Sequence, residues 1–299
     1  MKKLLFTGGT GFLGKNIYPL LAKEYDVTLC GITDKDDIKV NIAKEVPVLN
    51  EKYDIVLHAA GKAHVVPRTE AEKQAFFDVN LLGTKNLCKA LEKSGLPKAL
   101  IFISTVAVYG CDEGENITED HPLNGKTPYA LSKIQAEEFL TDWCKKHNVV
   151  LGIIRPSLIA GPNPPGNLGA MISGIKSGKY LSIGGGKARK SVLMVQDIVS
   201  LVNLLAQKGG VYNVCDDSQP TFRDLEKIIS EQLGGKRVIN IPYWTANILA
   251  KIGNILGSKA PINSNKLDKI TKTLTFSNEK AKRDLGWNPT DVLSSFKIL

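Results

Sequence analysis

The chain has 299 residues, of which 43% are apolar and 23% are charged. These values are typical of a globular protein of one or two domains, and they exclude a disordered, collagen-like or coiled-coil chain. Lysine and arginine outnumber aspartate and glutamate by 39 to 30, a net charge of +9, which leaves nucleic acid, a membrane surface or a phosphorylated ligand open as partners.

Five scattered cysteines form no C-x-x-C pair, so we expect reduced thiols and no metal site. The apolar run that ends at Phe6 is too short for a signal peptide, and no run reaches the roughly 18 apolar residues of a membrane span. We therefore expect a cytoplasmic protein without stable membrane insertion.

The first predicted elements are a buried strand at 4–7 and a helix that runs to residue 24. Between them lie three glycines spaced by two residues each. A glycine turn between a strand and a helix N-terminus is typical of a loop that binds the pyrophosphate of a dinucleotide. The candidate loop residues are Gly8, Gly11, Phe12, Leu13 and Gly14.

This glycine spacing is similar to that of the extended short-chain dehydrogenase/reductase family, in its branch of NAD-dependent epimerases and dehydratases of nucleotide sugars. The resemblance implies an α/β fold, a Rossmann-type doubly wound parallel sheet with a smaller α/β C-terminal domain for the substrate. We expect the dinucleotide-binding domain at 1–157 together with about 190–215, and the substrate domain mostly at 158–299. The family also implies a homodimer through the helix that carries Tyr129.

The second predicted strand, 27–30, is followed by Gly31, where an NAD-binding chain usually has an acidic residue for the adenosine ribose. The nearest acid is Asp34, a few positions later. NAD is the expected cofactor, and NADP stays open. The resemblance assigns Asn41 and Ile42 to the adenine.

The third strand, 53–58, ends in small residues across which a cofactor can lie. The resemblance assigns the cofactor to His58, Ala59, Ala60 and Gly61, with His58 more often a structural residue than a base. Lys62, a substrate candidate, begins a stretch similar to 4-keto-sugar reductases. Asn80 is expected to support the active site from a helix.

The strand at 99–103 leads into Ser104, Thr105 and Val106. The resemblance assigns Ser104 to the cofactor and makes Thr105 the catalytic hydroxyl, with Val106 beside the substrate. Nucleotide-sugar 4,6-dehydratases carry an Asp-Glu pair after this hydroxyl, whereas this chain has Val106 and Ala107. A 4,6-dehydratase is therefore disfavoured.

Thr127 and a proline at the next position predict a helix start, which places Tyr129 and Lys133 one turn apart on one face. A tyrosine with an ordinary pKa near 10 is a poor base at neutral pH, and an adjacent ammonium group favours the phenolate. We predict that Tyr129 exchanges a proton with a substrate hydroxyl and that Lys133 also holds the cofactor.

The strand at 149–154 ends in Arg155 and Pro156, which the resemblance assigns to the cofactor. Asn167, Arg189 and Lys190 are the candidates for the diphosphate of the substrate, although a basic loop in solvent explains Arg189 and Lys190 as well. Alternating strands and helices end near residue 155.

The excess of positive charge lies near the C-terminus, because residues 236–299 hold 11 basic and 4 acidic side chains. This segment contains an amphipathic stretch that predicts a helix. Its apolar face is interpreted as covering the substrate domain, and a membrane or a partner protein is the alternative. The residues of this face are Trp244, Ile248, Ile252, Ile255 and Leu256.

The favoured function is 4-epimerisation of a nucleotide sugar, with UDP as the expected nucleotide, through transient oxidation at C4. The alternatives are an NAD(P)H-dependent 4-keto-sugar reductase and a non-catalytic dinucleotide sensor on the same fold. We expect no nucleic-acid partner, because no basic surface interleaved with aromatic residues accompanies the charge.

Overall fold

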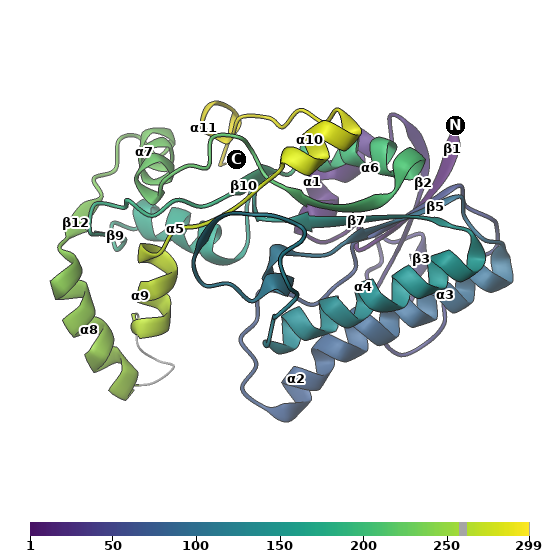
Figure 1. Cartoon of the computed structure of the whole chain (residues 1–299), viewed down its shortest axis with the longest axis horizontal. Helices are drawn as coiled ribbons and strands as arrows, with labels where there is room; N and C mark the ends of the chain where they lie inside the picture. The colour runs from purple at the N-terminus through teal and green to yellow at the C-terminus, as the bar shows by residue number, and fades with distance from the viewer. Residues whose placement is uncertain (257–261, 299) are drawn as a thin grey trace.

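A seven-stranded parallel sheet forms the centre of the computed structural model, which describes residues 1–256 and 262–298 (Figure 1). The strand order is β11-β7-β5-β4-β1-β2-β3. All neighbours in this sheet are parallel. The strands are β1 (Lys2–Thr7), β2 (Tyr25–Gly31), β3 (Ile38–Lys39), β4 (Ile55–His58), β5 (Ala99–Ile103), β7 (Val150–Pro156) and β11 (Gly210–Val214). This is the doubly wound α/β sheet that was predicted.

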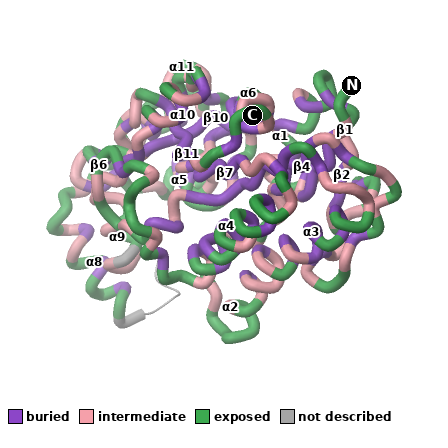
Figure 2. Tube along the Cα trace, turned by 45° about the vertical axis from the view of Figure 1, so that its right-hand side comes forward, coloured by how far each residue is buried: buried purple, intermediate pink, exposed green. Residues whose placement is uncertain are grey.

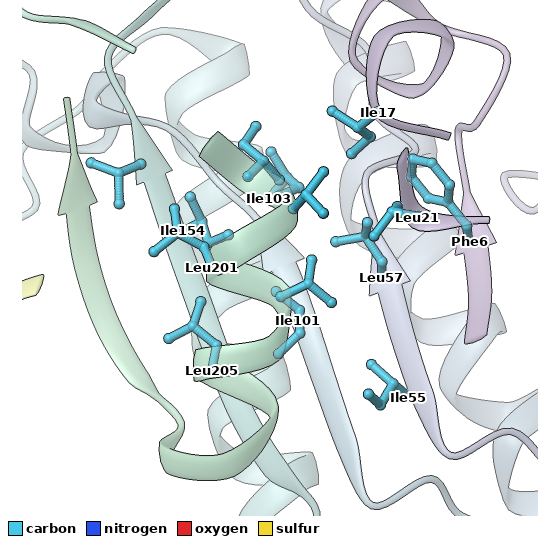
Figure 3. Close-up of a cluster of buried hydrophobic side chains, with 14 of the residues drawn as sticks. Phe6, Ile17, Leu21, Ile55, Leu57, Ile101, Ile103, Ile154, Leu201 and Leu205 are labelled. Carbon is cyan, nitrogen blue, oxygen red and sulfur yellow. The ribbon is translucent and has the colours of Figure 1, made fainter. Parts of the chain in front are cut away.

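Helices cover both faces of the sheet, as uninterrupted apolar strands require. One face carries α2 (Glu70–Phe77), α3 (Gly83–Ser94) and α4 (Pro128–His147), and the other carries α1 (Phe12–Leu21), α6 (Asp197–Lys208) and α10 (Glu279–Leu285) (Figure 1). The core under α1 and α6 packs Phe6, Leu57 and Ile154 against Leu201 and Leu205 (Figure 3). Ala281, Leu285 and Trp287 join this core, so part of the segment assigned to the substrate domain packs on the central sheet.

Besides the central sheet and the helices on its two faces, the described chain forms three two-stranded parallel sheets and five further α-helices. The strand pairs are β8 (Leu158–Ala160) with β10 (Val192–Met194), β9 (Leu181–Ile183) with β12 (Ile239–Ile241), and β6 (Gly114–Ile117) with β13 (Leu274–Phe276). The helices are α5 (Gly166–Lys176), α7 (Phe222–Gln232), α8 (Tyr243–Leu256), α9 (Ser264–Thr271) and α11 (Val292–Ser295). A second, smaller hydrophobic core lies between α5, α7 and α11.

The direction of strand succession reverses between β1 and β4, because β2 and β3 extend the sheet on one side and β4, β5 and β7 extend it on the other. In open parallel sheets, ligands bind outside the carboxyl ends of the strands at such a reversal. The glycine loop after β1 and the segment after β4 therefore meet at the expected place for a dinucleotide.

Helix α8 forms where the apolar period predicted it, but its orientation is the reverse of the interpretation. Ala246 and Ala250 are fully buried against Ile183 and Leu267, whereas the large apolar residues of the helix face outward. Small side chains permit this close approach to β9 and α9. The side chains of Ile255 and Leu256 lie outside the described residues. Over 1–256 and 262–298, no helix is both long enough and apolar enough to cross a bilayer.

Candidate active site

The glycine loop after β1 is shaped by two glycines that no other residue can replace without displacement. Gly8 has φ +78°, and a Cβ on it would lie 2.7 Å from the backbone nitrogen of Ala60. A Cβ on Gly14 would lie 2.1 Å from the carbonyl oxygen of Gly9. Gly11 is different, because its Cβ would meet the carbonyl oxygen of Gly8 at 3.3 Å and has no further neighbour within 4 Å among the described atoms. The space in front of Gly11 is therefore the cradle that a pyrophosphate would fill.

Phe12 and Leu13 begin α1 and pack at the margin of the first core, so their backbone N–H groups lie at the helix N-terminus. A Cβ on Gly161 would approach the Phe12 ring at 3.7 Å. The loop after β8 thus lies against the start of α1. Asn41 and Ile42 follow β3, and Ile42 is buried against the start of α3, where a Cβ on Gly83 would lie 3.0 Å from it.

Asp36 is an acidic residue in the turn between β2 and β3 that the sequence did not single out. Its Oδ2 accepts hydrogen bonds from the backbone and the hydroxyl of Thr33, at 2.9 and 2.7 Å. Its Oδ1 is buried without a partner among the described residues and would be 2.7 Å from a Cβ on Gly31. An acceptor without a donor at this position fits an adenosine ribose hydroxyl. Asp34, the acid named from the sequence, is exposed and pairs with Lys39.

The segment after β4 is held against β1 by the backbone. The N–H of Ala59 donates to the carbonyl of Thr7 at 3.2 Å, and the N–H of Ala60 donates to the Thr7 hydroxyl at 3.2 Å. A Cβ on Gly61 would lie 3.3 Å from Lys133 Nζ and 3.2 Å from Asn80 Oδ1. Gly61 therefore lets the backbone approach both side chains.

Asn80 lies in a π-helical turn, Asp78–Leu82, which interrupts the long helix formed by α2 and α3. Its Oδ1 accepts from the backbone N–H of Lys62 at 2.7 Å, and its Nδ2 donates to the Lys62 carbonyl and to the Ser132 hydroxyl. Such turns often aim a side chain at a functional site. Asn80 thus fixes the segment after β4 against α4, and Lys62 itself lies with its ammonium 5.8 Å from the centre of the Phe76 ring.

Thr105, Tyr129 and Lys133 come together at the carboxyl end of β5. Thr105 caps a short 3-10 helix (Val106–Tyr109), with its Oγ1 accepting from the N–H of Ala107 at 3.1 Å. Tyr129 is the second residue of α4 and forms a hydrogen bond with Thr105. Lys133, one turn further along α4, donates to the carbonyl of Ile103 at 2.8 Å. The three predicted catalytic groups are therefore contiguous.

Burial shifts the pKa values of Tyr129 and Lys133 in opposite directions, because it disfavours the charged form of each. Dehydration raises the pKa of the Tyr129 hydroxyl, against which the hydrogen bond with Thr105 acts. Burial lowers the pKa of Lys133 from 10.5 to about 8, opposed by the negative charge of Glu137. The tyrosine is consequently a phenol in the protein alone, and the lysine keeps most of its positive charge at pH 7.

Glu137, one further turn along α4, anchors a buried polar chain that the sequence analysis did not foresee. Arg155 donates to both of its carboxylate oxygens, at 3.1 and 2.6 Å, and Ser104 donates to the same carboxylate. Arg155 also donates to the Tyr109 hydroxyl at 3.0 Å, which in turn donates to Asn213 at 2.6 Å. This chain connects α4 with β7 and β11 beneath the catalytic residues.

Several predicted cofactor residues use their side chains inside the protein. The side chains of Ser104 and Arg155 bond Glu137 and so position α4, which leaves their assignment to the cofactor a prediction. His58 is fully buried, with Thr7 at 2.7 Å and Thr84 at 2.8 Å from its two ring nitrogens. Burial lowers its pKa to about 3, which excludes it as a charged ligand. Pro156 ends β7 in the interior.

Three of the predicted substrate residues, Asn167, Arg189 and Lys190, come from the C-terminal half of the chain. Lys190 is half-buried, donates to the carbonyl of Lys272 at 2.9 Å, and has its pKa lowered to about 8 by burial. Arg189 is exposed and bonds the carbonyl of Gln219. Asn167 is exposed in the first turn of α5. A Cβ on the neighbouring Gly166 would lie 3.0 Å from His64, so this turn lies against the segment that follows β4.

A dinucleotide cradle at the reversal of strand order, together with a tyrosine and a lysine one turn apart beside a hydroxyl, defines a Rossmann-type enzyme of the dehydrogenase/reductase class. Residues 4–215 match the model of the NAD dependent epimerase/dehydratase family, and the chain belongs to this family. The family predicted from the glycine spacing is therefore confirmed.

Known proteins of this family resemble the chain along most of its length. It is 29% identical to an N-acetyl-alpha-D-glucosaminyl-diphospho-ditrans,octacis-undecaprenol 4-epimerase of Escherichia coli O157:H7, over 93% of this chain and 88% of the relative. It is 28% identical to a UDP-glucose 4-epimerase of Vibrio cholerae, over 98% and 92%. The structure of RMD from Pseudomonas aeruginosa complexed with NADPH has the same fold, with TM-score 0.75 and 23% identity over 99% and 96% of the two chains.

Proposed function

We propose that the chain is a 4-epimerase of nucleotide sugars, with a UDP-sugar as its substrate. The observation that carries this proposal is the contiguous set of Thr105, Tyr129 and Lys133 at the carboxyl end of β5. Val106 and Ala107 follow the hydroxyl residue, and neither can move a proton in an elimination step. Both curated relatives described above are named as 4-epimerases.

The cradle at Gly11 and the unpartnered oxygen of Asp36 fit the two ends of an adenine dinucleotide. A nicotinamide cofactor held there would take a hydride from a sugar carbon and return it. Because a carboxylate accepts the two ribose hydroxyls but repels a 2′-phosphate, Asp36 supports NAD over NADP. Lys133 lies where it would bind the nicotinamide ribose.

The residues of the chain supply the proton chemistry. Tyr129 takes the proton of the C4 hydroxyl as that carbon becomes a ketone, and it returns the proton when the ketone is reduced. Thr105 holds the same sugar oxygen, and the positive charge of Lys133 lowers the free energy of the phenolate. We assign Lys190 to the diphosphate, which it would neutralise as a point charge without the two-pronged geometry of arginine.

A product assay without added cofactor tests the proposal. We expect the purified protein to interconvert UDP-glucose and UDP-galactose, or their N-acetylated forms, with no net oxidation. Tyr129→Phe removes the proton acceptor and should lower kcat by about 10² to 10⁴ while leaving NAD affinity unchanged. Stoichiometric loss of NAD(P)H with a 4-keto sugar would replace the proposal by a reductase. Binding of NAD without turnover of any sugar would replace it by a dinucleotide sensor.

A polyprenyl diphosphate is a second candidate for the group that carries the sugar, in place of a nucleoside diphosphate. The substrate in the name of the Escherichia coli relative joins its sugar through a diphosphate to undecaprenol in place of a nucleoside. The proposed chemistry takes place on the sugar and is the same for both carriers. The same assay with a polyprenyl-diphosphate sugar therefore shows which carrier the protein accepts. The expected homodimer would use α4, where Leu131 and the nearby Leu82 are exposed, and sedimentation at increasing concentration tests it.

A further inference from the structure

Helix α8 lies at the end of the molecule away from β1 (Figures 1 and 2). It exposes a stripe of large apolar side chains. Trp244, Ile248 and Ile252 follow one another at intervals of four residues and have exposed fractions of 66%, 52% and 50%. Tyr243 and Leu249 flank them and are also exposed. Scattered exposed apolar residues are ordinary, but a contiguous stripe indicates an interaction surface.

Two more exposed large apolar residues lie on the neighbouring sheet formed by β9 and β12. Leu181 and Ile239 are partners in register and are exposed by 42% and 51%. Side chains alternate along a strand, so these two share the sheet face of Ile183 and Ile241, which belong to the cluster that packs under α8. We call the exposed residues Leu181, Ile239, Tyr243, Trp244, Ile248, Leu249 and Ile252 the α8 patch.

The segments that carry the α8 patch contain basic but no acidic residues, and Glu226 and Asp268 come from the neighbouring helices α7 and α9. Residues 143–196 and 232–267, which contain β9, β12 and α8, include no aspartate and no glutamate. Lys179 precedes β9 by two positions and Arg237 precedes β12 by two, so the register of the parallel pair places both at the same end of the sheet. Lys176 and Lys236 are exposed nearby in the chain, and Lys251 is exposed on α8 itself.

We propose that the α8 patch is a docking surface for an anionic phospholipid membrane, on which the helix lies in the plane of the interface. Tryptophan and large aliphatic residues on one helix face enter the boundary between headgroups and acyl chains, while lysine and arginine bind the acidic headgroups. The basic residues on the segments that carry the patch favour an anionic lipid surface over a second copy of this basic chain. The inference goes beyond the proposed function and holds for either carrier of the sugar.

Trp244 reports the contact directly. Of the three tryptophans, Trp143 and Trp287 are buried at 6% and 3% exposure, so Trp244 dominates any change of emission caused by an outside surface. We expect a blue shift of the emission and co-sedimentation with phosphatidylglycerol vesicles, and neither effect with phosphatidylcholine vesicles. Added salt should weaken the binding, because each basic residue near an anionic surface contributes about fivefold at low ionic strength.

Two matched double variants decide the matter. Ile248→Ser with Ile252→Ser removes apolar area from the patch, keeps the reporter and should weaken vesicle binding at least tenfold. Val48→Ser with Val66→Ser removes two exposed apolar residues elsewhere, with exposed fractions of 76% and 85%, and should leave the binding unchanged. Thermal melts of both variants should match that of the parent chain, since all four residues are exposed.

Equal binding by the two double variants, or no binding to phosphatidylglycerol vesicles, would overturn the proposal. A blue shift that rises with protein concentration in the absence of lipid, and that the Ile248→Ser/Ile252→Ser variant loses, would assign the patch to self-association instead. Vesicle binding is measured without substrate. An enzyme that binds vesicles but fails to epimerise a sugar would therefore refute the proposed function alone.

Discussion

The ion pair between Arg155 and Glu137 gives the sharpest quantitative prediction. Both side chains are about 5% exposed, and the arginine makes two bonds to the carboxylate and one to Tyr109. Arg155→Met leaves the carboxylate buried with Ser104 and the nearby charge of Lys133. Removal of one partner of a buried pair costs about 3–5 kcal/mol, whereas replacement of both by apolar residues costs far less.

We therefore expect Arg155→Met to lower the melting temperature by about 6–10 °C, at about 2 °C per kcal/mol for a chain of this size. The double variant Arg155→Met/Glu137→Leu should recover at least half of this loss, because no buried charge remains. Calorimetry or circular dichroism at pH 7 measures both. A single variant that melts within about 2 °C of the parent, or a double variant that melts below the single one, would refute the reasoning.

Three further predictions concern the cofactor side of the site. Burial lowers the pKa of Lys133 to about 8, so the folded chain holds this proton less tightly than the unfolded chain, and the penalty is complete below pH 8 and fades toward pH 10.5. Lys133→Met should thus raise the melting temperature at pH 7 and raise it less at pH 10, and an equal gain at both would contradict this. Gly11→Ala should keep the melting temperature but weaken NAD binding in calorimetric titration at least tenfold, whereas Gly14→Ala should lower both, since its Cβ would overlap the carbonyl of Gly9. Asp36→Ala should weaken NAD about ten- to a hundredfold and leave NADP unaffected; a parallel loss of both would assign Asp36 to structure alone, and Asp34→Ala is the control.

Local patterns carried the prediction of the catalytic group. The positions of Thr105, Tyr129 and Lys133 follow from a strand end and a capped helix start. Short stretches of sequence are enough to predict both of these features. Thr127 caps α4 through the N–H of Ala130, as its position before a proline indicated. The carboxyl ends of neighbouring parallel strands meet at one edge, so these segments had to converge once the sheet formed.

The residues that the sequence did not reveal act through long-range or folded-back contacts. Asp36 returns to Gly31 through a turn held by Thr33, and three acids in the stretch 34–37 competed for the same role. A turn preference for Asp with a preceding Thr was the available signal. Glu137 meets Arg155 across 18 residues and Tyr109 meets Asn213 across 104, and no local period encodes such pairs.

Helix α8 shows why periodicity alone misassigns a face. The apolar period correctly indicated a helix, and burial of its large residues was the natural interpretation. A helix can instead pack through Ala246, Ala250 and Gly253, which are small enough to lie close to a thin two-stranded sheet. Which face of the helix becomes buried depends on where the neighbouring strands and helices lie. That arrangement is a property of the whole fold and not of the helix sequence.

Burial of the charged Lys133 beside the predicted catalytic hydroxyls costs stability. Lys133 is buried and would be more stable as an apolar residue, yet Glu137 at the next turn opposes the loss of its charge. Glu137 is in turn paired in the interior with Arg155, which also donates a hydrogen bond to Tyr109. Each buried charge thus requires the next, and the chain ends at a neutral amide, Asn213. The polar interior beneath β5 and β7 therefore links Lys133 through Glu137 and Arg155 to Tyr109 and Asn213.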